Sequence, residues 1–387
     1  MRNRIGAPVA GDDFFGREKE IEYVWELLKD GNNILLPSPR RVGKSSFAKK
    51  MLEKAAQNGW LTIEINLEKA NLEFQFIELL TDQLKTSAWD KTKEAANKLF
   101  ETLSLLKPKL SMGGASVSLE WQREKANVYR ELEKVLPHDK ETVIFFDEVA
   151  VLLNGMLTNA GGEKRHVEEL LHWLRSLRQV SNSKIRWIYC SSVGIENFTT
   201  SHQLSKTIND FKFYELKAFD LNTGKAMIQA LEEGNKVELT EEVREKMLDK
   251  LGYLLPYFIQ VLFEKIKGYH QLEARPINAD LIDEAYESII NGAYLSTWIE
   301  RLEEQYGTYK DDALVVLKHT CQAPKGVKRE NLVNVLHSKH QDIDQAESIL
   351  AKLLAMLKND GYLTEENNHY LFRSPLIRDF WYNRYAR

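Results

Sequence analysis

The sequence is poor in cysteine, with only Cys190 and Cys321 in 387 residues. The two lie far apart with no pairing pattern, so we interpret both as small buried hydrophobes in a reducing compartment. Long apolar runs are also missing, because no stretch approaches the ~20 residues that span a bilayer. The first residues lack the apolar segment of a signal peptide. Together these absences predict a cytoplasmic protein without a membrane partner.

An excess of one charge sign is missing as well. Lys and Arg number 53 against 57 Asp and Glu, which gives a formal net charge of −4. Nucleic-acid binding is typically signalled by a basic footprint, so the overall charge gives no indication of such a partner. Hydrophobic residues at 43% and charged residues at 28% are typical of a globular protein. The chain length predicts two or three domains.

A short apolar run, Ile34-Leu35-Leu36, is followed by a turn and then by the amphipathic segment Lys44 to Gln57. This pattern predicts a buried strand, a loop and a helix. The loop ends in Gly43-Lys44-Ser45, as in the phosphate-binding loop G-x-x-x-x-G-K-[ST]. Unpaired N–H groups at a helix N-terminus suit a polyphosphate. Gly43 allows close approach, Lys44 can reach the β- and γ-phosphates, and the Ser45 hydroxyl can hold Mg²⁺.

The first glycine of that loop pattern is absent, because Ser38 stands in its place. If the loop needs a positive φ there, serine costs roughly 1 kcal/mol more than glycine. A chance match in an ordinary strand–helix turn is the alternative. The residues that face the phosphates most directly are intact, which favours a nucleotide site.

A second buried-strand pattern, Thr142 to Phe146, ends in the carboxylates Asp147 and Glu148. P-loop NTPases need an acid at a strand end to complete the Mg²⁺ shell, and Asp147 fits that role. Glu148 is then placed to orient or deprotonate the attacking water. The alternative is a solvated strand end, but Lys44 and Ser45 in the same chain favour an ATPase site.

Two further candidates come from the next predicted helix and strand. Ser191, near the tip of the predicted strand Ile185 to Ser192, can sense the γ-phosphate or simply start a turn. Arg175 and Arg178 leave the end of the predicted helix Val167 to Gln179. Arginine there complements the helix dipole; alternatively, Arg178 is an arginine finger that reaches a neighbouring subunit.

The order of predicted elements divides the chain into three domains. In residues 1–217, strands and helices alternate, which predicts a parallel sheet with helices on both faces. An insertion at about 87–138 is predicted to hold helices and a hairpin that turns at Gly113-Gly114. Residues 218–304 predict a helical lid. Residues 305–387 predict a winged helix-turn-helix followed by a C-terminal helix.

These pieces together resemble the archaeal-type ATPase family of the STAND class, relatives of AAA+ proteins. Six segments carry the resemblance. They are Phe15-Gly16-Arg17-Glu18, Pro39-Arg40-Arg41-Val42-Gly43-Lys44-Ser45-Ser46, Phe146-Asp147-Glu148, Cys190-Ser191-Ser192-Val193-Gly194, Gly252-Tyr253-Leu254-Leu255-Pro256-Tyr257-Phe258 and Arg373-Ser374-Pro375-Leu376-Ile377-Arg378-Asp379-Phe380-Trp381.

The resemblance implies a nucleotide site with ATP and Mg²⁺ as cofactors and Ser45 and Asp147 as metal ligands. It implies that Phe15, Gly16 and Arg17 lie against adenine and ribose. The loop from Ser38 to Ser46 would surround the phosphates. Pro256 would lie near the nucleotide.

The resemblance also implies a nucleotide-driven switch, in which lid and winged helix rearrange to regulate a protein partner or self-assembly, in defence or signalling. One alternative is a DNA-binding ATPase of the initiator or transposition type. A DNA-reading helix needs basic or amide side chains, whereas the third helix of the winged domain opens with Asp342 and Asp344 and is mostly apolar. Another alternative, ATP binding without turnover, is disfavoured by Glu148.

Overall fold

The computed structural model describes residues 1–37, 39–86, 97, 99–101, 103, 115–159, 163–191 and 194–387. These residues form two compact units. The sheet unit contains Arg17–Pro37 and Lys44–Glu215, and the C-terminal unit contains Met1–Gly16, Ser38–Gly43 and Leu216–Arg387. None of the described helices is both long enough and apolar enough to cross a membrane.

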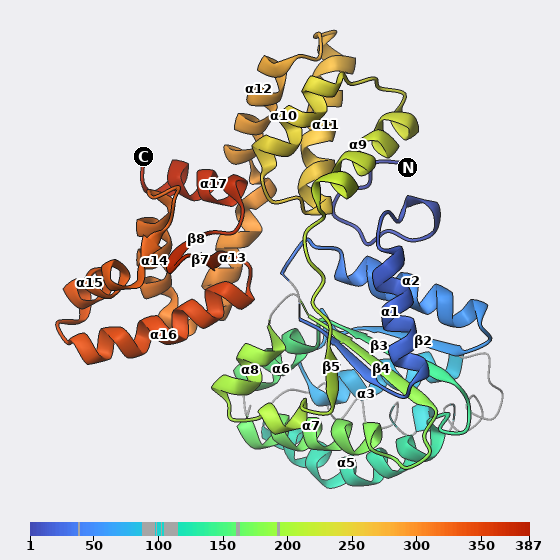
Figure 1. Cartoon of the computed structure of the whole chain (residues 1–387). Coiled ribbons are helices and arrows are strands. Elements are labelled where there is room, and N and C mark those ends of the chain that lie inside the picture. The colour runs from blue at the N-terminus through green and yellow to red at the C-terminus, as the bar shows by residue number, and fades with distance from the viewer. Residues whose placement is uncertain are drawn as a thin grey trace. The chain divides into compact units, whose positions relative to one another are not determined.

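The sheet unit is built on five strands, all paired in parallel (Figure 1). Their spatial order is β2-β3-β4-β1-β5, so β4 lies between β1 and β3. The predicted parallel sheet is therefore confirmed. The strands are β1 (Asn33–Leu36), β2 (Leu61–Asn66), β3 (Thr142–Asp147), β4 (Ile185–Cys190) and β5 (Phe211–Phe213).

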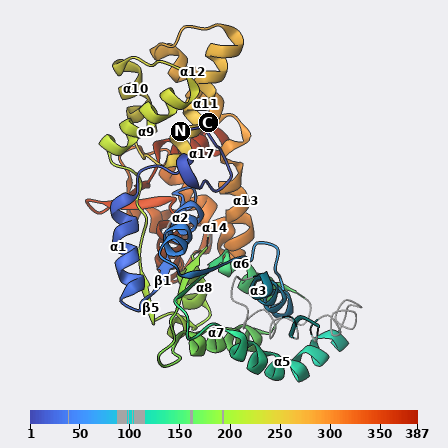
Figure 2. The ribbon, with the colours of Figure 1, turned by 90° about the vertical axis from the view of Figure 1, so that its right-hand side faces the viewer.

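Helices cover both faces of this sheet (Figures 1 and 2). One face is covered by α1 (Glu18–Lys29) and α2 (Lys44–Gln57). The other is covered by α3 (Glu73–Thr86), α5 (Ala115–Val135), α6 (Val149–Thr158) and α7 (Lys164–Arg178). The shorter α8 (Ile195–Ser201) follows β4 in the chain. Helices on both faces explain why β1, β3 and β4 are buried almost throughout and mostly apolar rather than alternating.

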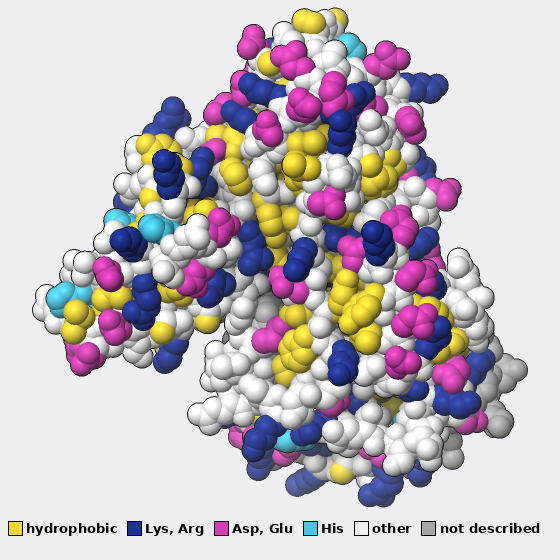
Figure 3. All heavy atoms as spheres, viewed as in Figure 1, with side chains coloured by type: hydrophobic (Ala, Val, Ile, Leu, Met, Phe, Trp, Pro, Cys, Tyr) yellow, Lys and Arg dark blue, Asp and Glu magenta, His cyan; other side chains and the backbone are white. Residues whose placement is uncertain are grey.

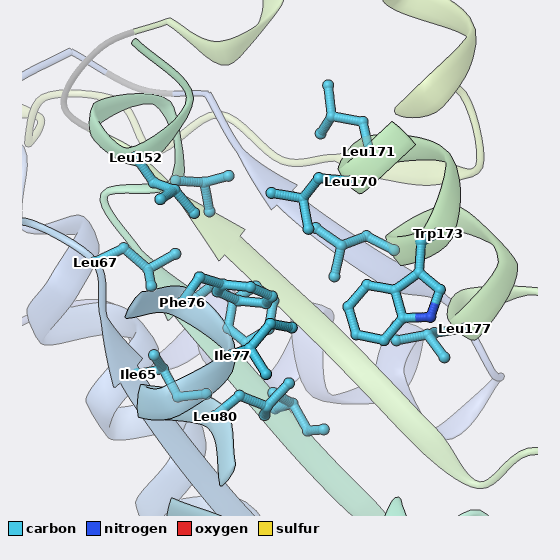
Figure 4. Close-up of a cluster of buried hydrophobic side chains, with 14 of the residues drawn as sticks. Ile65, Leu67, Phe76, Ile77, Leu80, Leu152, Leu170, Leu171, Trp173 and Leu177 are labelled. Atoms are coloured by element: carbon cyan, nitrogen blue, oxygen red, sulfur yellow. The ribbon is translucent and has the colours of Figure 1, made fainter. Parts of the chain in front are cut away.

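The main core of the sheet unit lies between the sheet and the second set of helices (Figure 4). Because successive side chains of a strand point to opposite faces, Phe146 and Trp187 enter this core from neighbouring strands. Phe146 meets Phe76 of α3 edge-on at a centroid distance of 5.3 Å. Each such side chain contributes about 1.5–3 kcal/mol on burial, so this packing holds β3 and β4 in place.

The described part of the insertion differs from its prediction. Ala115–Glu120 begin the long helix α5, so the predicted strand there is wrong, and Gly113-Gly114 lie outside the described residues. Apolar and polar residues alternate in this short window as they would in a strand. The helix prevails because Trp121, Val128 and Leu132, at helical spacing, are buried in the core. The described residues of the predicted helix at 91–106 are helical.

The C-terminal unit begins, after its N-terminal segment and η1 (Gly11–Asp13), with four helices. Three of them start at a side-chain cap, a feature worth about 1 kcal/mol each. Asp220 accepts from the Thr223 N–H at 2.7 Å, and Asn278 accepts from the Leu281 N–H at 3.0 Å. Thr240 caps the helix between them. The four are α9 (Leu221–Asn235), α10 (Glu241–Leu251), α11 (Pro256–Glu273) and α12 (Ala279–Ile290).

After α13 (Ser296–Gln305), the C-terminal unit continues with four more α-helices and three strands. Its three strands form an antiparallel sheet in the order β6-β8-β7. The hairpin turns at Asn367 and Asn368, whose φ values of 49° and 63° are those of the tight turn that asparagine tolerates. The elements are α14 (Lys310–Cys321), β6 (Val327–Lys328), α15 (Arg329–His340), α16 (Ile343–Asn359), β7 (Leu363–Glu366), β8 (His369–Phe372) and α17 (Pro375–Tyr385).

Candidate functional site

Three strand ends of the sheet unit lie side by side. β1 and β4 are in register at Leu36 and Cys190. β3 and β4 are in register at Phe146 and Tyr189, which places Asp147 level with Cys190. Since the strands are parallel, all three end at the same edge of the sheet. Ligands of open α/β sheets bind at this edge.

The lysine and the two predicted metal ligands of the sheet unit meet here. α2 begins at Lys44, whose side chain is buried, and Ser45 follows in its first turn. The Ser45 hydroxyl donates a hydrogen bond to the Asp147 carboxylate, and the Lys44 charge acts on the same carboxylate. Asp147 itself is only 6% exposed. The structure thus brings Lys44, Ser45 and Asp147 together at the end of β3.

The surroundings of Asp147 disfavour its ionised form. Burial is the largest cause and raises the pKa of Asp147, and the neighbouring Glu148 charge adds to it. Hydrogen bonds from Cys190 and Ser45 and the charge of Lys44 act in the opposite direction without cancelling the rise. The carboxylate form therefore costs folding free energy, as expected of a group held ready for a cation.

Replacing Asp147 with asparagine is expected to raise the melting temperature of the protein without nucleotide or metal. A raised pKa means that the folded chain holds the proton more tightly than the unfolded chain does. The contribution of Asp147 to the free energy of unfolding therefore falls as pH rises through the folded pKa. The stability gain should be largest at pH values above the raised pKa and should shrink as pH falls through it. Thermal unfolding across pH measures it. Asp82→Asn, at an exposed position of α3, is the control, and a variant less stable at every pH would contradict the expectation.

Glu148 leaves the strand in a left-handed conformation, with φ 60° and ψ 40°, just before α6. A non-glycine residue pays about 1–2 kcal/mol for this, a form of strain that clusters at functional sites. The backbone N–H of Glu148 donates to Oδ1 of Asp147 at 3.1 Å. Ser191 Oγ accepts from the Ala150 N–H at 3.3 Å and donates to Oε2 of Glu148 at 3.4 Å. The tip of β4 thus orients the predicted base.

Cys190 is a site residue that sequence reasoning missed, because it was interpreted as a buried hydrophobe and given no role of its own at the site. Its Sγ donates to Oδ1 of Asp147 at 2.8 Å. Burial raises the pKa of the Cys190 thiol, and the Asp147 charge adds to this, so the group stays protonated. One signal could have indicated this role. Cys190 is the last residue of β4, and β4 pairs with β3, the strand that ends in Asp147.

The phosphate-loop residues before Lys44 belong to the C-terminal unit. Gly43 has φ 97°, a left-handed conformation that glycine adopts without steric cost. The Arg41 guanidinium lies 4.1 Å from the ring centroid of Tyr257. Pro39 packs so closely on Gly361 that a Cβ there would lie 2.6 Å from the Pro39 Cβ. Val42 is buried, Arg40 and Ser46 are half-buried, and Ser38 lies outside the described residues.

The residues predicted to face adenine and ribose are placed as follows. Phe15 meets Phe219 edge-on at a centroid distance of 6.4 Å, within the C-terminal unit. Gly16 has φ 56°, and Pro256 is the first residue of α11. In the sheet unit, Arg17 is buried and pairs with Glu20 at 2.9 Å. Contact of these residues with a nucleotide stays a prediction.

Arg178 does not join the other predicted site residues. Its side chain is 1% exposed. Nε and Nη2 donate to the two Asp210 carboxylate oxygens at 2.7 and 2.9 Å. Nη2 also donates to the Thr207 carbonyl at 2.6 Å, and the guanidinium lies 4.3 Å from the Phe211 ring centroid. An arginine so enclosed favours a structural role, and Arg175 pairs with the same acid at 4.0 Å.

The donor set suits a hard cation bound together with a nucleotide. The Ser45 hydroxyl and the Asp147 carboxylate supply oxygen, which Mg²⁺ prefers. Among the described residues, no group of three or more His, Cys, Asp or Glu side chains could hold a metal ion. Mg²⁺ is usually bound by one or two carboxylates plus substrate phosphates rather than by an all-protein cage, so the residues present fit that ion.

Comparison with known proteins finds solved structures of similar fold. The Walker-type ATPase PABY2304 of Pyrococcus abyssi is similar in fold, with a TM-score of 0.66, 18% identity, and coverage of 98% of this chain and 99% of the other. The ORC2 protein of Aeropyrum pernix in its ADPNP–ADP complexes gives a TM-score of 0.54 and 12% identity, with coverage of 96% and 94%. No curated protein matches.

A family match completes the comparison. Residues 14–255 match the family described as an ATPase domain predominantly from Archaea. That span contains the phosphate loop and the strand ends that carry Asp147 and Ser191. A nucleotide-binding ATPase domain with an AAA+ type of fold follows from the match and from the solved structures. The chain belongs to this family of ATPase domains.

Proposed function

We propose that this protein binds ATP with Mg²⁺ and hydrolyses it slowly, as a molecular switch of the STAND/AAA+ type. The observation that carries the proposal is the meeting of Lys44, Ser45, Asp147 and Glu148 at the carboxyl edge of the sheet. A lysine, a hydroxyl and two acids are the groups that phosphoanhydride hydrolysis requires.

Each of these residues has a distinct role in the proposed reaction. Lys44 binds the β- and γ-phosphates, and Ser45 and Asp147 hold the metal. Mg²⁺, when bound, neutralises charge on the phosphates. Glu148 accepts a proton from the attacking water or orients that water. Ser191, through its hydrogen bond to Glu148, holds the base in place.

The C-terminal unit supports the switch part of the proposal. Within that unit, Arg41 contacts Tyr257 at the start of α11, and Pro39 contacts Gly361 before β7. A ligand that reshapes this loop would therefore act directly on the predicted lid and on the predicted winged helix-turn-helix. We propose that this rearrangement regulates a protein partner or self-assembly, as in defence or signalling.

Replacing Lys44 with alanine is expected to weaken binding of a non-hydrolysable ATP analogue about tenfold or more, because hydrogen bonds to charged groups contribute about 1.5–3 kcal/mol. Titration calorimetry with Mg²⁺ present measures the affinity. Lys50→Ala is the matched control, since it removes the same charge from the same helix and breaks only the ion pair with Glu53. Equal affinities for Lys44→Ala, Lys50→Ala and wild type would refute the assignment.

DNA binding through the predicted winged helix-turn-helix is the disfavoured alternative. The exposed side chains of α16 include the acids Asp344 and Glu347 as well as Lys352. On the face shown in Figure 3, basic and acidic side chains of this module are interspersed rather than gathered into a basic stripe. Salt-dependent binding of duplex DNA at physiological ionic strength would reverse this conclusion.

A further inference from the structure

One oxygen of the Asp147 carboxylate receives two hydrogen bonds from its own neighbours. Cys190 Sγ lies 2.8 Å from Oδ1, and the Glu148 backbone nitrogen lies 3.1 Å from the same oxygen. A carboxylate turns easily about its last torsion, because that torsion has broad and roughly two-fold wells. Two donors on one oxygen fix the orientation of the group and leave Oδ2 as the oxygen that neither of them occupies.

The thiol is well placed for this task. Cys190 is 1% exposed and Asp147 is 6% exposed, so no bulk solvent replaces the thiol donor if it is removed. An apolar side chain of similar size would take the thiol donor away from Oδ1. The next residue acts in the same way on the next acid, since Ser191 donates to Glu148. Consecutive donors at the end of β4 therefore hold the consecutive acids at the end of β3.

We infer that Cys190 is a positioning residue, whose S–H donor fixes the Asp147 carboxylate in the orientation that receives the divalent cation. The inference rests on the proposed function, because it assigns Asp147 to the metal. Loss of a hydrogen-bond partner of a metal ligand typically lowers metal affinity by about 10–100-fold. Since a thiol is a weak donor, the effect here should be at the lower end, about tenfold.

The test compares Cys190→Ala with Cys190→Ser. These side chains have nearly the same volume and differ only in the hydroxyl donor, so both leave the same cavity. Mn²⁺ serves as the probe, and the free-ion EPR signal is titrated with protein saturated with a non-hydrolysable ATP analogue. Cys190→Ala should bind Mn²⁺ about tenfold more weakly than wild type, and Cys190→Ser should regain most of the affinity.

Two controls separate positioning from packing. Cys321, the other buried thiol, donates to the Lys318 carbonyl in α14 at 3.2 Å, so alanine and serine there should leave Mn²⁺ affinity unchanged. In an Asp147→Asn background, exchanging alanine for serine at position 190 should also make no difference. If Cys190→Ala fails to fold, the isosteric pair Cys190→Val and Cys190→Thr repeats the comparison.

The outcomes distinguish this inference from the proposed function. If wild type binds Mn²⁺ and the analogue but the alanine and serine variants bind Mn²⁺ equally, Cys190 does not position Asp147. The same conclusion follows if the difference persists in the Asp147→Asn background. If wild type binds neither the analogue nor Mn²⁺, the proposed function itself fails.

Discussion

Glu148→Gln is expected to bind ATP as wild type does and to lose hydrolysis by about 10²–10⁴-fold, the range that general-base catalysis contributes. Glutamine keeps the size of the side chain and can still accept from Ser191 Oγ, which now lies 3.4 Å from Oε2. It cannot take a proton from water. Steady-state phosphate release measures turnover, and titration with a non-hydrolysable ATP analogue measures binding.

Glu141→Gln is the matched control for this variant. Glu141 immediately precedes β3 and pairs loosely with Lys184 at 3.9 Å, so it lies at the opposite end of the strand from Glu148. Its turnover should equal that of wild type. Equal turnover in Glu148→Gln would remove the base assignment. A wild type that binds ATP without measurable phosphate release would favour the binding-only alternative.

Much of the sheet unit could be predicted because its sequence signals are local. The apolar run before Asp147 has no periodicity of three to four residues, and it ends at charged residues, so it indicates a strand with both faces buried. The phosphate loop is a contiguous pattern whose chemistry follows from its own residues. The parallel pairing then brings Ser191 and Asp147 to one edge without further information.

The remaining errors arose where distant residues decide the structure. Ala115–Glu120 became helix because Trp121, six residues into α5, donates its indole N–H to buried Glu73 at 2.7 Å. Cys190 gained a polar role only through the register of β4 with β3. The Trp121–Glu73 contact joins residues 48 positions apart and the Cys190–Asp147 contact joins residues 43 apart, so local patterns could not predict either partner.

The role of Arg178 could not be decided from local sequence either. Its position at a helix end is compatible both with an arginine finger and with a structural arginine. Burial alone would lower the pKa of Arg178, but its electrostatic contacts with Tyr189 and with the Asp210 carboxylate, and its hydrogen bonds to both, hold that pKa above its ordinary value. The guanidinium therefore stays charged inside the sheet unit. Its hydrogen bonds to Asp210 and Thr207 fix the guanidinium in place.

Arg178→Ala is expected to destabilise the protein by about 3 kcal/mol, the lower end of what breaking one side of a buried pair costs, because Asp210 keeps some exposure. Urea unfolding of the full chain, followed by tryptophan fluorescence, measures this loss. Arg175→Ala, which removes only the 4.0 Å contact to the same acid, should cost about 0–1 kcal/mol. Lysine at position 178 keeps the charge but cannot reproduce the bidentate contact, so it should recover only part of the stability.

The unfolding data distinguish an arginine finger from a structural arginine at position 178. A finger that acts on a neighbouring subunit would leave the unfolding midpoint unchanged and would lower hydrolysis only at concentrations where subunits associate. A structural arginine would shift the midpoint at any concentration, and the Asp210→Asn variant would shift it in the same direction. Because the guanidinium donates to Asp210 and Thr207 within its own unit, we expect the second result.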